Sequence, residues 1–190
     1  MGIYVNPGNT LFRLALNSEI YVDKSLMITE LNKLYDTLQM FVCMSRARRF
    51  GKTMMASLMT AYYSKGCDSR QLFEKLQLSK QDGWDKYLNA TNVIRIDLNS
   101  VYSRTLDKSQ TIKALQIEVV GELREQFPTT QIPASTSIAA AIIKIFNKLG
   151  EKFVIIIDEY DVLIRDKSVA ESLCKEYIDF LNSIFKSNEI

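Results

Sequence analysis

Apolar side chains recur every three or four positions in five stretches of the chain, the spacing that places them on one face of an α-helix. The pattern predicts helices over residues 26–34, 55–62, 112–123, 138–149 and 169–184. Gly66 and Gly150 follow the second and fourth of these segments and are expected as helix C-caps. The last helix is expected to begin at a capping box formed by Ser168-Val169-Ala170-Glu171.

Three shorter apolar segments predict strands. Residues 40–44 are continuously apolar, which is too short for a helix and indicates a buried strand. Residues 93–98 alternate apolar and polar side chains, and residues 153–157 form a continuous run typical of a strand covered on both faces of a parallel sheet. Strands that alternate with helices predict an α/β layered fold with a mostly parallel sheet.

A glycine-containing basic segment follows the first predicted strand and opens the next helix, which is the setting of a phosphate-binding loop. Backbone N–H groups and the helix dipole would hold an anion there, Lys52 would reach phosphate oxygens, and the Thr53 hydroxyl would bind Mg²⁺. A lone Gly-Lys-Thr is also common in ordinary loops, and Arg46 stands where the usual pattern has its first glycine. The residues predicted to contact nucleotide are Arg46, Ala47, Arg48, Arg49, Phe50, Gly51, Lys52, Thr53 and Met54, with 46–53 as a Walker A-like loop.

Two carboxylates, Asp158 and Glu159, follow the last predicted strand. The carboxyl edge of a parallel sheet is where α/β proteins place their ligands, although such residues also occur as plain exits from strands. As a Walker B-like strand over 154–159, the segment would supply Asp158 as a second Mg²⁺ ligand and Glu159 as the group that polarises an attacking water. Glu159 and Lys52 are thus the predicted catalytic residues. Tyr160 and Asp161 either extend this acidic edge or belong to a solvated loop.

Composition and charge exclude several classes of catalytic and metal site and indicate where anions could bind. The chain has no histidine, which excludes a Ser/His/Asp triad and zinc sites that use histidine. The net charge is only +2, but five basic residues and no acidic one lie between Thr37 and Cys67, where Arg48 and Arg49 would contact phosphates or pair with acids elsewhere. The three widely spaced cysteines, the absence of a secretory signal and the short apolar runs predict a cytoplasmic protein without a membrane segment.

These segments, in order, resemble the AAA-ATPase-like family that is abundant in gut bacteria. The resemblance rests on Gly2-Ile3-Tyr4, Asn6-Pro7-Gly8-Asn9, Ile20 to Ser25, Arg46 to Thr53, Ala61 to Arg70 and Ile156 to Asp161. It implies a P-loop NTPase fold of the AAA/ASCE type, which is a three-layer sandwich that binds ATP and Mg²⁺. It also implies that the segment Tyr21 to Ser25 lies near the base of the nucleotide. Ala47 departs from the proline that the family usually carries, so the loop is expected to be more flexible.

The resemblance also bears on domain organisation. Family members usually continue into a further strand with a polar sensor residue and then into a domain similar to PD-(D/E)XK nucleases. Residues 1–190 are therefore expected to be an AAA-ATPase-like domain that is incomplete at its C-terminus and lacks the nuclease-like domain. Because the missing strand would lie between the two motif strands, a gap or an unusual pairing is expected between Met40 and Val154.

The sequence is compatible with two functions. The first is a Mg²⁺-dependent ATP-hydrolysing module, and the alternative is a nucleotide-binding regulatory module with little hydrolysis that controls an attached or partner domain. Self-association is possible for either. No basic surface interleaved with aromatic residues is evident, so direct nucleic-acid binding is not expected.

Overall fold

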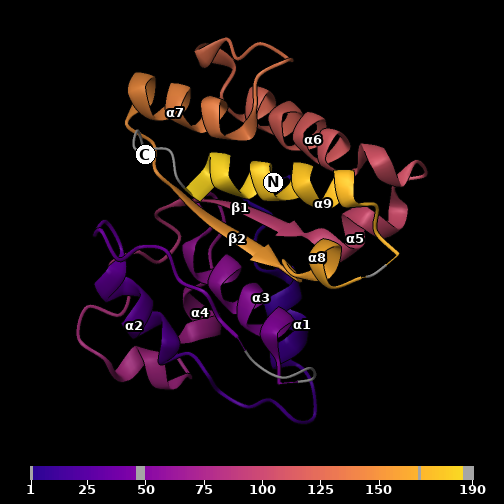
Figure 1. Ribbon diagram of the computed structural model, residues 1–190. Helices are drawn as coiled ribbons and strands as arrows, with labels where there is room; N and C mark the ends of the chain where they lie inside the picture. Colours follow the sequence, from indigo (N-terminus) through magenta and orange to yellow (C-terminus); the bar gives the residue numbers. More distant parts are fainter. Residues whose placement is uncertain (1, 46–49, 167, 186–190) are drawn as a thin grey trace. The chain divides into compact units, whose positions relative to one another are not determined.

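The computed structural model describes residues 2–45, 50–166 and 168–185 (Figure 1). They form two compact units. The first comprises Asn6–Arg95 and Val154–Ile156, and the second comprises Gly2–Val5, Ile96–Phe153 and Ile157–Ile190, as far as these ranges are described.

The first unit is built around a buried helix, α3. Nine consecutive residues of α3, from Met55 to Tyr63, are buried, and α1 packs against this helix. Phe12 of α1 stacks on Phe73 at 5.1 Å between ring centroids, and Tyr62 meets Phe73 edge-on at 5.5 Å. Its elements are α1 (Thr10–Leu16), α2 (Met27–Leu34), α3 (Lys52–Tyr63), α4 (Arg70–Phe73), the 3-10 helix η1 (Gln77–Lys80) and most of β1 (Asn92–Asp97).

The C-terminus of α3 is held by Asn89. The side-chain amide of Asn89 donates to the carbonyl oxygens of Ala61 (3.0 Å) and Ser64 (2.9 Å), and its backbone N–H donates to Tyr62 (2.6 Å). These bonds satisfy carbonyl groups that a helix end leaves without partners. Ser64 is therefore the C-cap, and the prediction of Gly66 in that role is wrong: Gly66 lies two residues further on, with a φ of +85°.

The second unit is mainly helical. In it α6 packs against both α7 and α9, as Figure 1 shows. Glu122 of α6 accepts hydrogen bonds from the backbone N–H groups of Ile3, Tyr4 and Val5, which ties the first residues to this helix. Its elements are α5 (Leu98–Arg104), η2 (Lys108–Gln110), α6 (Thr111–Gln126), η3 (Pro128–Thr130), α7 (Ile138–Leu149), α8 (Val162–Arg165) and α9 (Glu171–Phe185).

The sheet has two parallel strands, β1 and β2 (Phe153–Asp158), and each strand contributes residues to both units. The strands predicted over 93–98 and 153–157 are confirmed within one residue as β1 and β2. Only Ile156 and Asp158 of β2 are buried, however, so the prediction that this strand is covered on both faces is wrong. Within the described chain β2 pairs along one edge alone, and its side chains lack the neighbours that a second flanking strand would supply.

The predicted strand at 40–44 is wrong. Residues 40–44 carry no regular structure and pair with neither strand of the sheet as described. Met40, Phe41 and Val42 are 40%, 54% and 47% exposed. A continuous apolar run becomes a buried strand only where it joins a sheet, and neither strand of the described sheet pairs with residues 40–44.

The predicted capping box at Ser168 is also wrong. The backbone N–H and the hydroxyl of Ser168 both donate to the carboxylate of Asp166, at 2.9 and 2.7 Å. The side chain is thus used in a local turn, and α9 begins at Glu171, with Leu173 and Cys174 bonding to the carbonyl of Ala170. The helices predicted over 26–34, 55–62, 112–123 and 138–149 are confirmed as α2, α3, α6 and α7, and Gly150 caps α7 with a φ of +69°.

Candidate functional site

The helix that follows the predicted phosphate loop starts at Lys52. Gly51 is its N-cap in a left-handed conformation, with φ +81° and ψ 30°, and the Gly51 carbonyl accepts the first helical bond from Met55 at 3.0 Å. Lys52 and Met54 are half-buried, whereas Thr53 is exposed. The N-terminal turn of a twelve-residue helix lies here, and the N–H groups of such a turn point toward the position that an anion would take. Arg46, Ala47, Arg48 and Arg49 lie outside the described residues.

Lys24 lies against the start of α3. Its ammonium group donates a hydrogen bond of 2.8 Å to the carbonyl oxygen of Phe50. A Cβ placed on Gly51 would lie 3.3 Å from the same nitrogen, so the absence of a side chain at Gly51 allows this close approach. The family resemblance implies that the segment Tyr21 to Ser25 lies near the nucleotide base, but no motif in the sequence predicts the contact between Lys24 and Phe50.

The turn that carries Lys24 is anchored on both sides. Asp23 accepts from the backbone N–H groups of Ser25 (2.8 Å) and Gln77 (2.7 Å), and the buried Ser25 hydroxyl oxygen accepts from Leu78 N–H (3.1 Å). Burial of the Asp23 carboxyl opposes its ionisation, but the hydrogen bonds from Gln77 and Ser25 and the charge of Lys80 hold its pKa below the usual value of 3.8. Asp23 is therefore the ionised anchor of the turn.

A cavity of about 640 Å³ opens beside this turn in the first unit. Two ammonium groups, those of Lys24 and Lys52, line it together with a largely apolar wall. Such a combination of apolar surface and a few charged groups is typical of sites for small anionic ligands that carry an apolar part. The other lining residues are Met27, Cys43, Met44, Ser45, Phe50 and Met55.

Asp158 ends β2 and is only 6% exposed. Its Oδ1 atom accepts the backbone N–H of Glu159 at 3.0 Å, while its Oδ2 atom is buried without a hydrogen-bond partner in the part of the chain that is described. A buried carboxylate oxygen without a partner is costly, and such atoms are found where a cation or an ordered water completes the site. Oxygen is also the ligand that Mg²⁺ prefers.

Glu159 is half-buried and has a φ of +51°. A left-handed backbone at a residue with a long side chain costs free energy and is common where a side chain must be directed toward a ligand. The two residues that follow are engaged locally. The carboxylate of Asp161 pairs with Arg165 at 2.9 Å, and Asp161 is the residue from which α8 starts. The carbonyl of Tyr160 accepts a hydrogen bond from the Tyr177 hydroxyl at 2.7 Å.

The predicted site residues are thus divided between the units. Lys52, Thr53 and Met54 lie in the first unit, and Asp158 and Glu159 lie in the second. Among the residues with described positions, no three Cys, Asp or Glu side chains gather as a ready-made metal cluster. Likewise, none of the helices in the described ranges has the length and apolar character needed to span a membrane.

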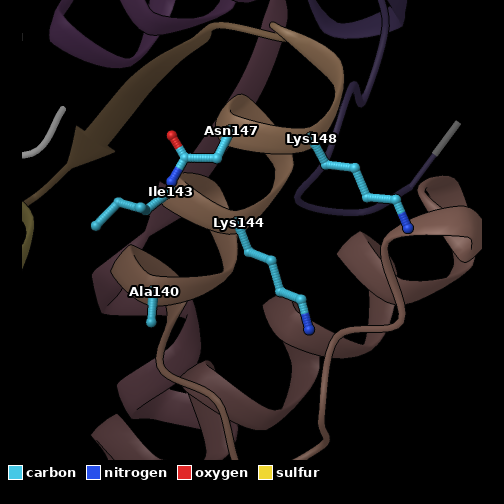
Figure 2. Close-up of a pocket in the computed structure, with 5 residues that line it drawn as sticks. All are labelled: Ala140, Ile143, Lys144, Asn147 and Lys148. Carbon is cyan, nitrogen blue, oxygen red and sulfur yellow. The ribbon is translucent and has the colours of Figure 1, made fainter.

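A second hollow, of about 570 Å³, lies on α7 and is lined by Ala140, Ile143, Lys144, Asn147 and Lys148 (Figure 2). Its two ammonium groups are already engaged in the loop before the helix. Lys144 donates to the carbonyl of Gln131 at 2.9 Å, and Lys148 donates to the carbonyl of Thr129. These lysines stabilise the connection from α6 to α7, and the hollow offers little polar chemistry beyond them.

The structure defines a mixed helix and strand protein with a small parallel sheet, a glycine-capped helix start and a strand that ends in a buried carboxylate. The profile of one family, described as predicted AAA-ATPase, matches residues 10–189. The chain belongs to this AAA-ATPase-like family, which confirms the resemblance seen in its motifs and supports a nucleotide-binding role in general. No curated protein and no solved structure gives a significant match.

Proposed function

We propose that this chain is a P-loop NTPase module that binds ATP and hydrolyses it in the presence of Mg²⁺. The observation that carries the proposal is the buried Oδ2 atom of Asp158, which has no partner among the described residues at the end of β2. Membership of the AAA-ATPase-like family supports it. The glycine-capped start of α3 also supports it, because the N–H groups of this helix start would bind the phosphates of ATP.

The phosphate chain of ATP is assigned to the start of α3 and to the loop before it. The N–H groups of the first helical turn and the Lys52 ammonium would neutralise the β- and γ-phosphates. The cavity that Lys24 and Lys52 line offers an apolar wall for the rest of the nucleotide. The full set assigned to the nucleotide remains Arg46, Ala47, Arg48, Arg49, Phe50, Gly51, Lys52, Thr53 and Met54.

Mg²⁺ would be held by the Thr53 hydroxyl and the Asp158 carboxylate, both of which are oxygen donors. When bound, the ion neutralises charge on the β- and γ-phosphate oxygens. Glu159 would accept a hydrogen bond from the attacking water and orient it toward the γ-phosphate. Glu159 and Lys52 are thus the residues proposed to act directly on the reacting groups.

Calorimetry with MgATP on the 190-residue chain tests the binding. Lys52→Ala is expected to weaken affinity by about tenfold or more, because a charge-assisted contact to phosphate is lost. Lys75→Ala is the matched control, since Lys75 is exposed on the same unit. Wild-type chain that binds no MgATP at millimolar concentration would overturn the proposal.

Phosphate release tests the reaction. Glu159→Gln keeps the size of the side chain but removes its charge, and is expected to slow turnover by about 100-fold with little change in binding. Tight MgATP binding without turnover in the wild type would instead favour the regulatory module with little hydrolysis. Equal turnover in the wild type and in Glu159→Gln would remove Glu159 from the mechanism.

A further inference from the structure

We propose that Lys24 is a positioning residue that orients the peptide between Phe50 and Gly51, from which α3 begins. The inference deepens the proposed function, because it assigns a role in nucleotide binding to a residue outside the loop. It rests on the 2.8 Å hydrogen bond from the Lys24 ammonium to the Phe50 carbonyl oxygen.

The direction of this bond sets the direction of the neighbouring N–H group. In a trans peptide the carbonyl of Phe50 and the N–H of Gly51 point to opposite sides. A carbonyl bound by Lys24 is therefore turned toward the lysine, and the Gly51 N–H is turned away from it. The contact neutralises a carbonyl dipole that would otherwise be free to turn toward an anion at the helix start.

The conformation of Gly51 fits this role. Its φ of +81° is the left-handed region that favours glycine, and its carbonyl accepts the first hydrogen bond of α3 from Met55 N–H at 3.0 Å. A Cβ at this position would lie 3.3 Å from the Lys24 nitrogen. Gly51 thus allows the close approach of Lys24, and the Lys24 ammonium group holds the peptide that precedes Gly51.

Lys24 itself is exposed, so its precision must come from the backbone that carries it. Asp23 and Ser25 on either side are bonded to the backbone N–H groups of Gln77 and Leu78. The turn 23–25 is therefore fixed to η1, and the side chain of Lys24 bridges from this anchor to the start of α3. Removing that bridge should loosen the start of the helix without disturbing the buried core of the unit.

Amide hydrogen exchange without nucleotide tests the first part. In Lys24→Met the Met55 amide, which is bonded to Gly51, is expected to exchange about tenfold faster. The Ser64 amide at the other end of α3, bonded to Thr60 at 3.0 Å, is the internal reference and should not change. Lys24→Arg keeps the charge and the donor and should restore the slow rate, and Lys75→Met should leave it unchanged.

Calorimetry with MgATP on the same variants tests the second part. Lys24→Met is expected to weaken binding by about tenfold, and Lys24→Arg by much less. Weaker binding with unchanged exchange at Met55 would indicate direct contact of Lys24 with the nucleotide and would overturn the positioning role. So would unchanged exchange and affinity together. If the wild type bound no MgATP, the proposed function would fail, whereas the exchange rates would still decide whether Lys24 holds the turn.

Discussion

The hydroxyl of Tyr177 donates a hydrogen bond of 2.7 Å to the backbone carbonyl of Tyr160. Tyr177 is fully buried on α9, and Tyr160 directly follows Glu159. Burial, together with the charge of Asp161, raises the pKa of the Tyr177 phenol, which therefore remains a donor at neutral pH. The C-terminal helix thus fixes the backbone next to the proposed water-orienting residue.

Tyr177→Phe is expected to lower the free energy of unfolding by about 1 kcal/mol, because one hydrogen bond is lost while the ring is retained. Turnover should fall more than MgATP affinity, since the backbone next to Glu159 loses a support. Urea denaturation and phosphate release measure the two effects. Tyr102→Phe is the control, because the ring contact of Tyr102 with the Lys108 ammonium does not need the hydroxyl.

Asp158→Asn is expected to stabilise the nucleotide-free chain by about 1 kcal/mol, because an amide is less costly to bury than a carboxyl group whose Oδ2 atom has no partner among the described residues. If the proposed function is right, Mg²⁺ and ATP together should raise the melting temperature of the wild type, and the same change should remove that increase. Thermal denaturation with and without both ligands measures this. Asp161→Asn should instead lose a little stability, through its pair with Arg165, and keep the response to ligands.

Retention of the MgATP response in Asp158→Asn would contradict the assignment of this residue to Mg²⁺. A large loss of stability in that variant would show that the Oδ2 atom is already satisfied in the folded chain.

The pH dependence of stability should report Asp23. Its pKa is lower in the folded chain than the usual 3.8, so its contribution is present above that value and is lost as the pH falls through the folded pKa. The wild type should therefore be more stable than Asp23→Asn at pH 6, and the difference should shrink as the pH falls below about 4. Urea denaturation over this range measures it, and a difference that does not vary with pH would contradict the anchor role.

Alanine variants of two glycines distinguish the effect of left-handed backbone strain from the effect of losing the contact with Lys24. Gly51 and Gly66 have similar φ values, +81° and +85°, but a Cβ on Gly66 would meet no atom within 4 Å. Gly51→Ala and Gly66→Ala should each lower the free energy of unfolding by about 1 kcal/mol through the left-handed backbone. Only Gly51→Ala should also weaken MgATP binding, as measured by calorimetry. Equal affinities in the two variants would remove the start of α3 from the site.

The local patterns predicted much of the secondary structure. The apolar stripe that ends before Gly150 predicts α7 correctly, because that glycine adopts the left-handed conformation that ends a helix. The run 153–157 predicts β2, because its β-branched side chains favour extended backbone. The short helix α5 was missed, although Asp97 caps it by accepting the Ser100 N–H at 3.0 Å, a signal that the sequence does contain.

Features that depend on partners distant in the chain were not predictable. Residues 40–44 have the composition of a buried strand, but a strand also needs a neighbour in the sheet. Ser168 is a local exception: it has the spacing of a capping residue, but Asp166, only two residues before it, takes up its hydroxyl. The bond from Lys24 to Phe50 spans 26 positions along the chain, and no local pattern encodes it. For the candidate site, Asp158 was predicted from its place after a strand, while its unpartnered buried oxygen required the structure.

The parallel pairing of β1 with β2 also predicts an order of folding. Residues 98–152 separate the two strands, so the ladder forms only after a long loop has closed, whereas α6 and α7 pack together within that loop. We therefore expect the helices to form early in refolding and the ladder to form in a slower step. Asp158 belongs to that slower step, so the chain should gain its helical signal before this proposed Mg²⁺ ligand is in place.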